Sequence, residues 1–450
     1  MKAVNYAVER EALVVNPVKT CQPIGAVYAA LGIHGCMPHS HGSQGCASYL
    51  RMHLSRHFRE PALCTTSSFS EGQVVFGGSA NLKQGIKNLV KIYRPQVVAV
   101  HTTCSAETIG DDVPGIIAEL KKTGEVPEDL IIFSASTPSY VGSHITGFAN
   151  MIKAAVEALA TPGEKNTRIN LLPGFVNPGD VREIKRILSL MDIDAIVLPD
   201  VSGVLDAPMT GELKLYQDGG TRTEDIKDMA NAQVTIALGE EANLLAGEYL
   251  EEKFKVPLEV LPVPIGVENT DLFLMTLAKY TGKPIPPELE EERGRLMDML
   301  LDAHAHWYGK RVAIYGDPDL TLALVGMAKT LGLIPAYVVT GTRSDSWQRQ
   351  VEALTPEARV ANGADLFTLH GWIKEEKVDL LLGNTYGKFI AREEKIPLVR
   401  VGFPVLDRAN LQHFPLVGYR GMAWLAERIG NTLLDWKDMF IEKHRLELVQ

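Results

Sequence analysis

The chain has 450 residues, a formal net charge of −10, and ordinary shares of hydrophobic (46%) and charged (22%) residues. This length is typical of two or three domains. The negative charge argues against a nucleic-acid partner, which would need a basic face. We find neither a signal peptide nor an apolar run of membrane-spanning length, so we expect a cytoplasmic protein without membrane contact.

The first part of the chain is predicted to be irregular until a regular alternation of helices and strands begins. Residues 1–20 are predicted to form an irregular arm, and residues 21–76 to be rich in loops. The elements expected next, in chain order, are helix 46–57, helix 81–94, strand 96–101, helix 113–122 and strand 130–134. A strand, a helix and a strand of these lengths indicate a parallel α/β unit.

The same alternation continues to the end of the chain. The further predicted elements are strand 168–172, helix 181–191, strands 195–198, 234–238 and 258–263, helix 288–306, and strands 311–315, 336–339, 379–382 and 398–401. We predict an α/β fold with three Rossmann-like domains, whose parallel sheets are flanked by helices, plus the amino-terminal arm. Joints rich in Gly, Pro, Lys and Thr place the domains at 1–20 (arm), 21–163, 164–283 and 284–450.

All five cysteines lie in the first 104 residues, and the other 346 residues have none. They are Cys21, Cys36, Cys46, Cys64 and Cys104. An odd number of cysteines without a signal peptide fits a reducing compartment better than a disulfide scaffold. Thiolates are soft ligands that suit iron–sulfur clusters, and the glycines nearby let backbone approach a bulky group closely.

The cysteine pattern leaves two interpretations open. A free cysteine is often only a small buried hydrophobe, and the chain has no C-x₂-C pair of the kind found in zinc ribbons and ferredoxins. An iron–sulfur cluster usually takes four thiolates, whereas Cys21, Cys46 and Cys104 supply three. Either Cys36 or Cys64 completes the set, or a second chain contributes. We favour a packing role for these last two.

Two polar loops follow neighbouring predicted strands. Cys104 comes directly after strand 96–101, and Ser139 comes after strand 130–134. Because open parallel sheets carry their ligand loops at the carboxyl ends of strands, we expect these two loops to face one crevice. Taken without any relative, Ser139 would be a turn hydroxyl that bonds local backbone.

Several motifs resemble the β subunits of nitrogenase molybdenum–iron proteins, and the resemblance covers nearly the whole chain. These motifs are Cys21-Gln22-Pro23-Ile24-Gly25-Ala26, His41-Gly42-Ser43-Gln44-Gly45-Cys46, His57-Phe58-Arg59-Glu60-Pro61, Val75-Phe76-Gly77-Gly78, Thr102-Thr103-Cys104, Ile109-Gly110-Asp111-Asp112, Thr137-Pro138-Ser139, Asn384-Thr385-Tyr386-Gly387-Lys388-Phe389-Ile390 and Gly402-Phe403-Pro404.

This resemblance implies a cofactor and its ligands. Cys21, Cys46 and Cys104 would bind the P-cluster, an [8Fe-7S] centre shared with the α subunit, which would make residues 21–163 the cluster-binding domain. Ser139 falls at the family's serine that coordinates the oxidised cluster. A hydroxyl oxygen is a hard ligand that favours more oxidised iron and gives up a proton on binding. The iron–molybdenum cofactor would lie only in the α subunit.

The resemblance also implies an inter-subunit ion site and a docking residue. Arg59 (through its carbonyl), Glu60, Asp298 and Asp302 would hold Ca²⁺ or Fe²⁺ between two β subunits of an α₂β₂ heterotetramer. Asp298 and Asp302 are four residues apart on a predicted helix, so they share a face, although a solvated face is the commoner meaning of such a pair. Phe76, predicted to lie in a glycine-flanked loop, would meet the iron protein during transient docking.

The implied activity is that of nitrogenase, with reduced ferredoxin or flavodoxin as the ultimate electron donor. The chain would hold half of a relay cluster that passes electrons from the iron protein to the cofactor that reduces dinitrogen to ammonia. Alternatives from the same resemblance are a cofactor-assembly scaffold, a tetrapyrrole reductase with one [4Fe-4S] cluster, and a subunit of an alternative-metal nitrogenase. The joint presence of Cys21, Cys46, Cys104 and Ser139 favours the enzyme, and Gly42-Ser43-Gln44-Gly45-Cys46 favours the molybdenum form.

Overall fold

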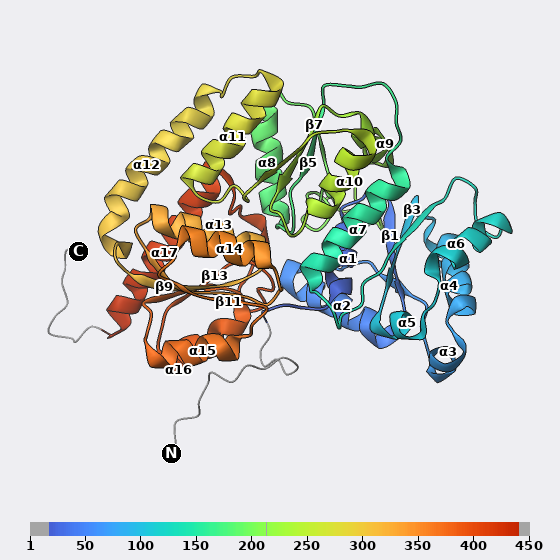
Figure 1. The fold of residues 1–450 in the computed structure, drawn as a ribbon, viewed down its shortest axis with the longest axis horizontal. Coiled ribbons are helices and arrows are strands. Elements are labelled where there is room, and N and C mark those ends of the chain that lie inside the picture. The colour runs from blue at the N-terminus through green and yellow to red at the C-terminus, as the bar shows by residue number, and fades with distance from the viewer. Residues whose placement is uncertain (1–17, 213, 441–450) are drawn as a thin grey trace, which may run out of the picture.

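A computed structural model describes residues 18–440 except residue 213, so most of the predicted arm lies outside the described residues. The described chain forms three parallel sheets flanked by helices, as the sequence predicts (Figure 1). No helix in this part of the chain is both long enough and apolar enough to cross a bilayer.

The amino-terminal sheet has the strand order β2-β1-β3-β4, with β1 opposite β3 from Cys36–Val97 to His41–Thr102. The elements of this unit are α1 (Gln22–Leu31), β1 (Cys36–His41), α2 (Gln44–Phe58), β2 (Thr65–Thr66), α3 (Glu71–Phe76), α4 (Ser79–Tyr93), β3 (Val97–Thr102), α5 (Cys104–Ile109), α6 (Val113–Lys122), β4 (Ile131–Ala135) and α7 (His144–Leu159).

The middle sheet has the order β6-β5-β7-β8, and the carboxyl-terminal sheet has the order β11-β10-β9-β12-β13. The middle unit comprises β5 (Ile169–Leu172), α8 (Pro178–Leu190), β6 (Ala195–Val197), α9 (Thr223–Asp228), η1 (Met229–Asn231), β7 (Val234–Leu238), α10 (Leu244–Phe254), β8 (Leu258–Leu261) and α11 (Val267–Thr281). The last unit comprises α12 (Pro287–Trp307), β9 (Arg311–Gly316), α13 (Pro318–Thr330), β10 (Ile334–Thr340), α14 (Asp345–Leu354), β11 (Arg359–Asn362), α15 (Leu366–Glu375), β12 (Leu380–Gly383), η2 (Thr385–Gly387), α16 (Lys388–Glu394), β13 (Leu398–Arg400), η3 (Leu411–His413) and α17 (Gly418–Phe440).

Each sheet falls within one of the three predicted ranges, and the predicted joints coincide with non-helical, non-strand segments after α7 and after α11. We therefore propose that the boundaries at residues 163/164 and 283/284 separate the domains. The largest hydrophobic core nevertheless runs through all three units without a break, from Val97 through Leu171 to Ile314. The three units are thus packed against one another and are not separated by flexible linkers.

The predicted helix 46–57 is present as α2, but the rest of residues 21–76 is less rich in loops than predicted. Residues 22–31 form α1, whose ten residues are all buried, and residues 36–41 form the central strand β1. A helix buried on every side has no polar face, so it gives no helical periodicity in the sequence. The strand contains Pro38 and three buried polar residues, a composition that normally indicates a loop.

Helices α1 and α7 approach each other closely because glycine lies at two contact points. A Cβ atom at position 25 would lie 1.7 Å from the carbonyl oxygen of His144, and one at position 147 would lie 2.0 Å from the carbonyl oxygen of Gln22. Both of these neighbours are backbone atoms, which cannot move aside as a side chain would. This contact brings the start of α1 against the loop that follows β4.

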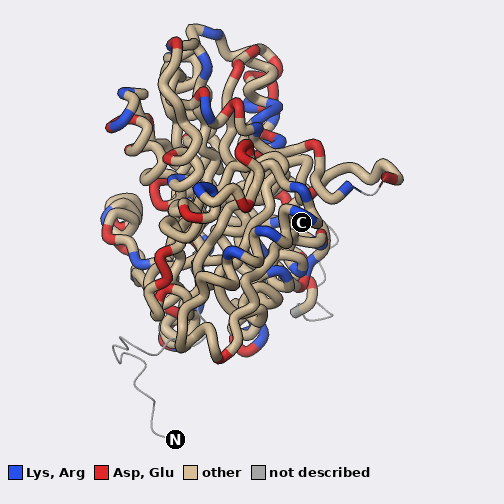
Figure 2. Tube along the Cα trace, turned by 90° about the vertical axis from the view of Figure 1, so that its right-hand side faces the viewer, with Lys and Arg blue, Asp and Glu red and all other residues tan. Residues whose placement is uncertain are grey.

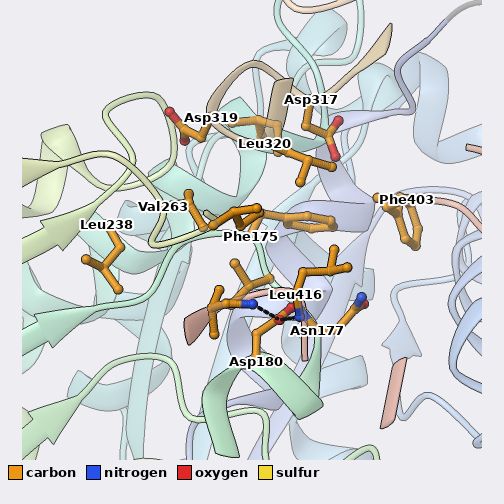
Figure 3. Close-up of a pocket in the computed structure, with 15 residues that line it drawn as sticks. Phe175, Asn177, Asp180, Leu238, Val263, Asp317, Asp319, Leu320, Phe403 and Leu416 are labelled. Atoms are coloured by element: carbon orange, nitrogen blue, oxygen red, sulfur yellow. Dashed lines mark hydrogen bonds between the residues drawn. The ribbon is translucent and has the colours of Figure 1, made fainter. Parts of the chain in front are cut away.

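Buried carboxylates join the three units around a small apolar cavity that Phe175 and Phe403 line (Figure 3). On α8, Asp180 accepts hydrogen bonds from the backbone N–H groups of Leu416 (2.6 Å) and Val417 (3.3 Å). Burial raises the pKa of this carboxyl to about 6, although these N–H groups oppose the shift. Asp319 on α13 bonds the amides that precede α10, and Asp317 lies 2.9 Å from Nε2 of His144. Each carboxylate connects two units, so they fix the units relative to one another.

The glycine contact gives a stability prediction. We expect Gly147→Ala to lower the free energy of unfolding by about 1–3 kcal/mol, because the added methyl group overpacks against backbone. Gly326→Ala, inside α13, is the matched control, since its Cβ would meet only the side-chain nitrogen of Asn269 on α11, 3.9 Å away. This control is expected to be neutral or to stabilise by up to ~1 kcal/mol, because alanine favours the helix. Chemical denaturation measures both, and equal effects would contradict the argument.

Candidate functional site

Three of the five cysteines lie at helix N-termini and are exposed. Cys21 is the N-cap residue of α1, Cys46 lies in the first turn of α2, and Cys104 is the first residue of α5. The partial positive charge at a helix N-terminus stabilises a thiolate. All three thiols therefore lie where a helix dipole favours a negative charge.

The same edge of the amino-terminal sheet carries most of these residues. Strands β1, β3 and β4 are neighbours, and the loops or helices after their carboxyl ends carry Cys46, Cys104 and Ser139 respectively. Two of the chain segments nearly touch, because a Cβ at Gly42 would lie 1.9 Å from the Thr103 hydroxyl. The segments that carry Cys104 and Ser139 therefore lie at the same edge of the sheet, and their facing one crevice stays a prediction.

The three exposed thiols are close enough to affect one another electrostatically. The pKa of Cys46 is raised, first by burial and then by the negative charges of Cys104 and Cys21. Among the described residues, these three do not form a set of ligand atoms that all lie within 4.8 Å of one another.

The other two cysteines differ from these three in their environment. Cys36 lies inside β1 and is 3% exposed, and burial raises its pKa to about 12. Burial likewise raises the pKa of Cys64 to about 12, and its thiol donates to the carbonyl oxygen of Thr65. A thiol with such a pKa stays protonated at neutral pH, so both cysteines are suited to packing rather than to ligation.

A buried polar network, which we did not predict from the sequence, lies behind the cysteine loops. His41 in β1 places Nε2 3.0 Å from Asp111 and Nδ1 2.9 Å from Ser67. The Asp111 carboxylate also accepts the Gly78 N–H, and the carbonyl oxygen of His41 accepts the Thr103 N–H. Both His41 and Asp111 belong to motifs named above, which was the available signal. The network ties the start of α4 to the loop that precedes Cys104.

Phe76 is the last residue of α3 and does not lie in a loop, which corrects the prediction. Its side chain is 89% exposed, and that of Val75 beside it is 73% exposed. Gly77 follows in the left-handed region (φ 90°), which ends the helix and leaves Phe76 at its tip. Adjacent exposed apolar residues of this size indicate a contact surface for another molecule.

The four predicted ion ligands do not form a site within one chain. Arg59 caps α2 in the left-handed conformation (φ 62°), and its guanidinium donates to the carbonyl oxygens of Leu406 and Arg408. Glu60, Asp298 and Asp302 are all exposed, and the two aspartates are one turn apart on α12. They are absent from the one set of three His, Cys, Asp or Glu ligands found among the described residues, which is His370, Glu393 and Glu394.

Known proteins are similar to this chain over nearly its whole length. A sequence model of the family described as "Nitrogenase component 1 type Oxidoreductase" matches residues 21–434. The nitrogenase molybdenum-iron protein beta chain of Clostridium pasteurianum is 53% identical over 434 residues, which are 95% of each chain. That of Rippkaea orientalis is 43% identical over 442 residues, covering 96% of this chain and 86% of its own length. A solved structure described as "Nitrogenase Cp1 at pH 6.5" has a TM-score of 0.96 at 52% identity, covering 98% of both chains.

The two cysteine environments predict different reactivity. After metal removal by a chelator under anaerobic conditions, we expect iodoacetamide at pH 8 to label Cys21, Cys46 and Cys104. Cys36 and Cys64 should remain unlabelled until the protein is denatured, because a thiol with a pKa near 12 is almost entirely protonated at this pH. Mass spectrometry of the peptides measures the labelling. Labelling of Cys36 to the same extent as Cys46 in the folded protein would show that the Cys36 thiol is accessible and not buried.

Proposed function

The chain belongs to the nitrogenase component 1 type oxidoreductases, and from this premise we propose that it is the β subunit of a nitrogenase molybdenum–iron protein. The observation that carries the proposal is the set of three exposed thiols at helix N-termini, two of which follow neighbouring strands of one sheet. A cluster bound by these three thiols would be enclosed by this chain on one side only. Thiols at the surface are what a cluster shared with a second subunit requires.

The proposed ligands are Cys21, Cys46 and Cys104, which hold half of an [8Fe-7S] P-cluster while the α subunit holds the other half. When bound, the cluster stores electrons from the iron protein and passes them to the iron–molybdenum cofactor of the α subunit, where dinitrogen is reduced to ammonia. The contribution of this chain is to present thiolates, stabilise their charge by helix dipoles and limit access of water.

Ser139 is proposed as an oxygen ligand used in the oxidised state. Its loop follows β4, beside the strand whose end precedes Cys104. No hydrogen bond ties the Ser139 hydroxyl to another described residue, so this oxygen is available. A hard oxygen donor stabilises more oxidised iron, and its proton leaves as it binds.

We propose further contacts with three partners. The α subunit would cover the exposed cysteine edge, where Tyr49 and Tyr140 also present exposed aromatic rings. The iron protein would dock on Phe76 at the tip of α3. A second β subunit would complete the ion site, with Arg59 and Glu60 from one copy and Asp298 and Asp302 from the other; oxygen ligands suit Ca²⁺ or Fe²⁺ there.

The charge distribution agrees with protein partners rather than nucleic acid. In the view of Figure 2, the basic and acidic residues are intermingled over the chain trace and do not form a basic stripe. Together with the net charge of −10, this leaves the phosphate backbone of a nucleic acid without a complementary surface there.

The proposal is tested by changing one thiol in each environment. The chain is co-expressed anaerobically with its α subunit, and iron and inorganic sulfide are measured per αβ pair. Cys46→Ala is expected to lose most of the iron that belongs to the shared cluster, because one of the three proposed thiolate ligands is removed from the exposed edge. Cys36→Ala is the matched control and should retain wild-type iron. Four irons per pair that survive Cys46→Ala would contradict the proposal and indicate a scaffold or a simpler reductase.

Phe76 gives a separate test of docking. We expect Phe76→Ala to raise the concentration of iron protein needed for half-maximal rate by about 30-fold, because an exposed aromatic anchor is typically worth about 2 kcal/mol in an interface. The iron content should stay unchanged, since Phe76 is not one of the proposed cluster ligands. Ile334→Ala removes another exposed apolar side chain, 46% exposed at the start of β10, and should have no effect. An unchanged dependence on iron protein in Phe76→Ala would overturn its docking role.

A further inference from the structure

The loop that carries Ser139 is hydrogen-bonded at its two ends to the elements next to Cys21 and Cys104. Its distal end is held by Gln22, the residue after Cys21. The Gln22 side-chain amide donates to the carbonyl oxygens of Pro138 (2.8 Å) and Val141 (2.6 Å), which flank Ser139 on both sides. Gln22 is only 2% exposed, so water does not replace these bonds.

The proximal end of the same loop is held by the Cys104 element. Glu107 on α5 accepts hydrogen bonds from the hydroxyls of Thr102 and Ser136, both at 2.5 Å. The Thr102 hydroxyl in turn accepts the N–H of Thr137 (2.8 Å), and the Thr137 hydroxyl donates to the carbonyl oxygen of Thr102 (2.6 Å). The segment before Ser139 therefore moves with the strand end that precedes Cys104.

Gln22 is itself held in place from behind. The Asn150 amide on α7 donates to Oε1 of Gln22 (3.4 Å) and to the carbonyl oxygen of Ser136 (3.1 Å). The Gln22 carboxamide is thereby oriented with its N–H₂ group toward the loop, since its oxygen is occupied by a donor. Both protons of this amide are used on the two carbonyls that bracket Ser139, whereas packing alone would need no such pairing.

We propose that Gln22 is a positioning residue that fixes the Ser139 hydroxyl at the distance from the cysteines at which it can bind the oxidised cluster. This inference rests on the proposed function of Ser139. Gln22, the residue after Cys21, thus determines where the Ser139 hydroxyl lies. Loss of the two hydrogen bonds frees the 138–141 turn but leaves the helices that carry the three thiols unchanged. The thiols would therefore hold the reduced cluster as before, whereas ligation by the Ser139 oxygen would be weakened.

The test is a double-mutant cycle in the complete αβ complex, with the midpoint potential of cluster oxidation as readout. Ser139→Ala should raise this potential, because a hard donor that stabilises oxidised iron is removed. Gln22→Met keeps the length of the side chain and removes both N–H donors, and it should shift the potential in the same direction. In the Ser139→Ala background, Gln22→Met should produce no further shift, since its effect is exerted through Ser139. The electron paramagnetic resonance signal of the oxidised cluster should change in both single variants, with iron and sulfide content unchanged.

Three outcomes decide the matter. Coupled shifts support the inference. A shift in Ser139→Ala without one in Gln22→Met, or equal and additive shifts, overturns the positioning role and leaves the Ser139 ligand intact. No shift in Ser139→Ala overturns the proposed ligand and the inference with it.

A second variant covers the case in which Gln22→Met fails to assemble the cluster. Asn150→Ala leaves Gln22 in place and removes the amide that orients it, so it should give a smaller shift of the same sign that also vanishes in the Ser139→Ala background. Asn88→Ala is a control for the loss of an amide elsewhere, since the Asn88 side chain accepts a hydrogen bond from Gln84 on the exposed face of α4. If the midpoint potential of cluster oxidation in Asn150→Ala equals that in Asn88→Ala, the inference is overturned.

Discussion

The close contact of α1 with α7 is the constraint on which the site depends. At Gly25 and Gly147 each helix lies against backbone of the other, with no room for a side chain. This packing places the first residues of α1 beside the turn before α7. Gln22, next to Cys21, therefore contacts the turn that carries Ser139, although Cys21 and Ser139 are 118 positions apart in the sequence. Without the contact, the ends of β1, β3 and β4 would supply only part of the ligand set.

Helix dipoles explain why thiols are tolerated together at this edge. Three thiolates close to one another repel, and the raised pKa of Cys46 reflects that repulsion in addition to burial. Each thiol lies at the start of a helix, where unpaired N–H groups supply partial positive charge. The protein thus offsets part of the electrostatic cost before any metal binds. The cationic irons of a cluster, and helices of a second subunit, would offset the remainder.

We propose that this chain supplies only half of the site, and the exposed residues around it agree with that proposal. The thiols proposed as ligands are exposed, whereas Cys36 is buried and Cys64 is partly buried. The proposed ion ligands are divided in the same way, because the carboxylates of α12 and Glu60 after α2 do not lie together in a single chain. A chain that completes its sites only with partners leaves ligand atoms at its surface, and their exposure identifies the faces that partners cover.

The sequence alone determined the α/β class, the three repeated units, the confinement of thiols to the first unit and, through its motifs, the family. Periodic elements such as α6 and β7 were predicted with the observed bounds because one face or a short apolar run records their burial. Only the tertiary structure decided that residues 22–31 form a helix, because burial on every side leaves no pattern in the sequence. It also decided the roles of Gln22, Glu107 and His41. Their function lies in hydrogen bonds to residues that are distant in the chain, and neither composition nor spacing encodes which backbone carbonyl a buried amide will face.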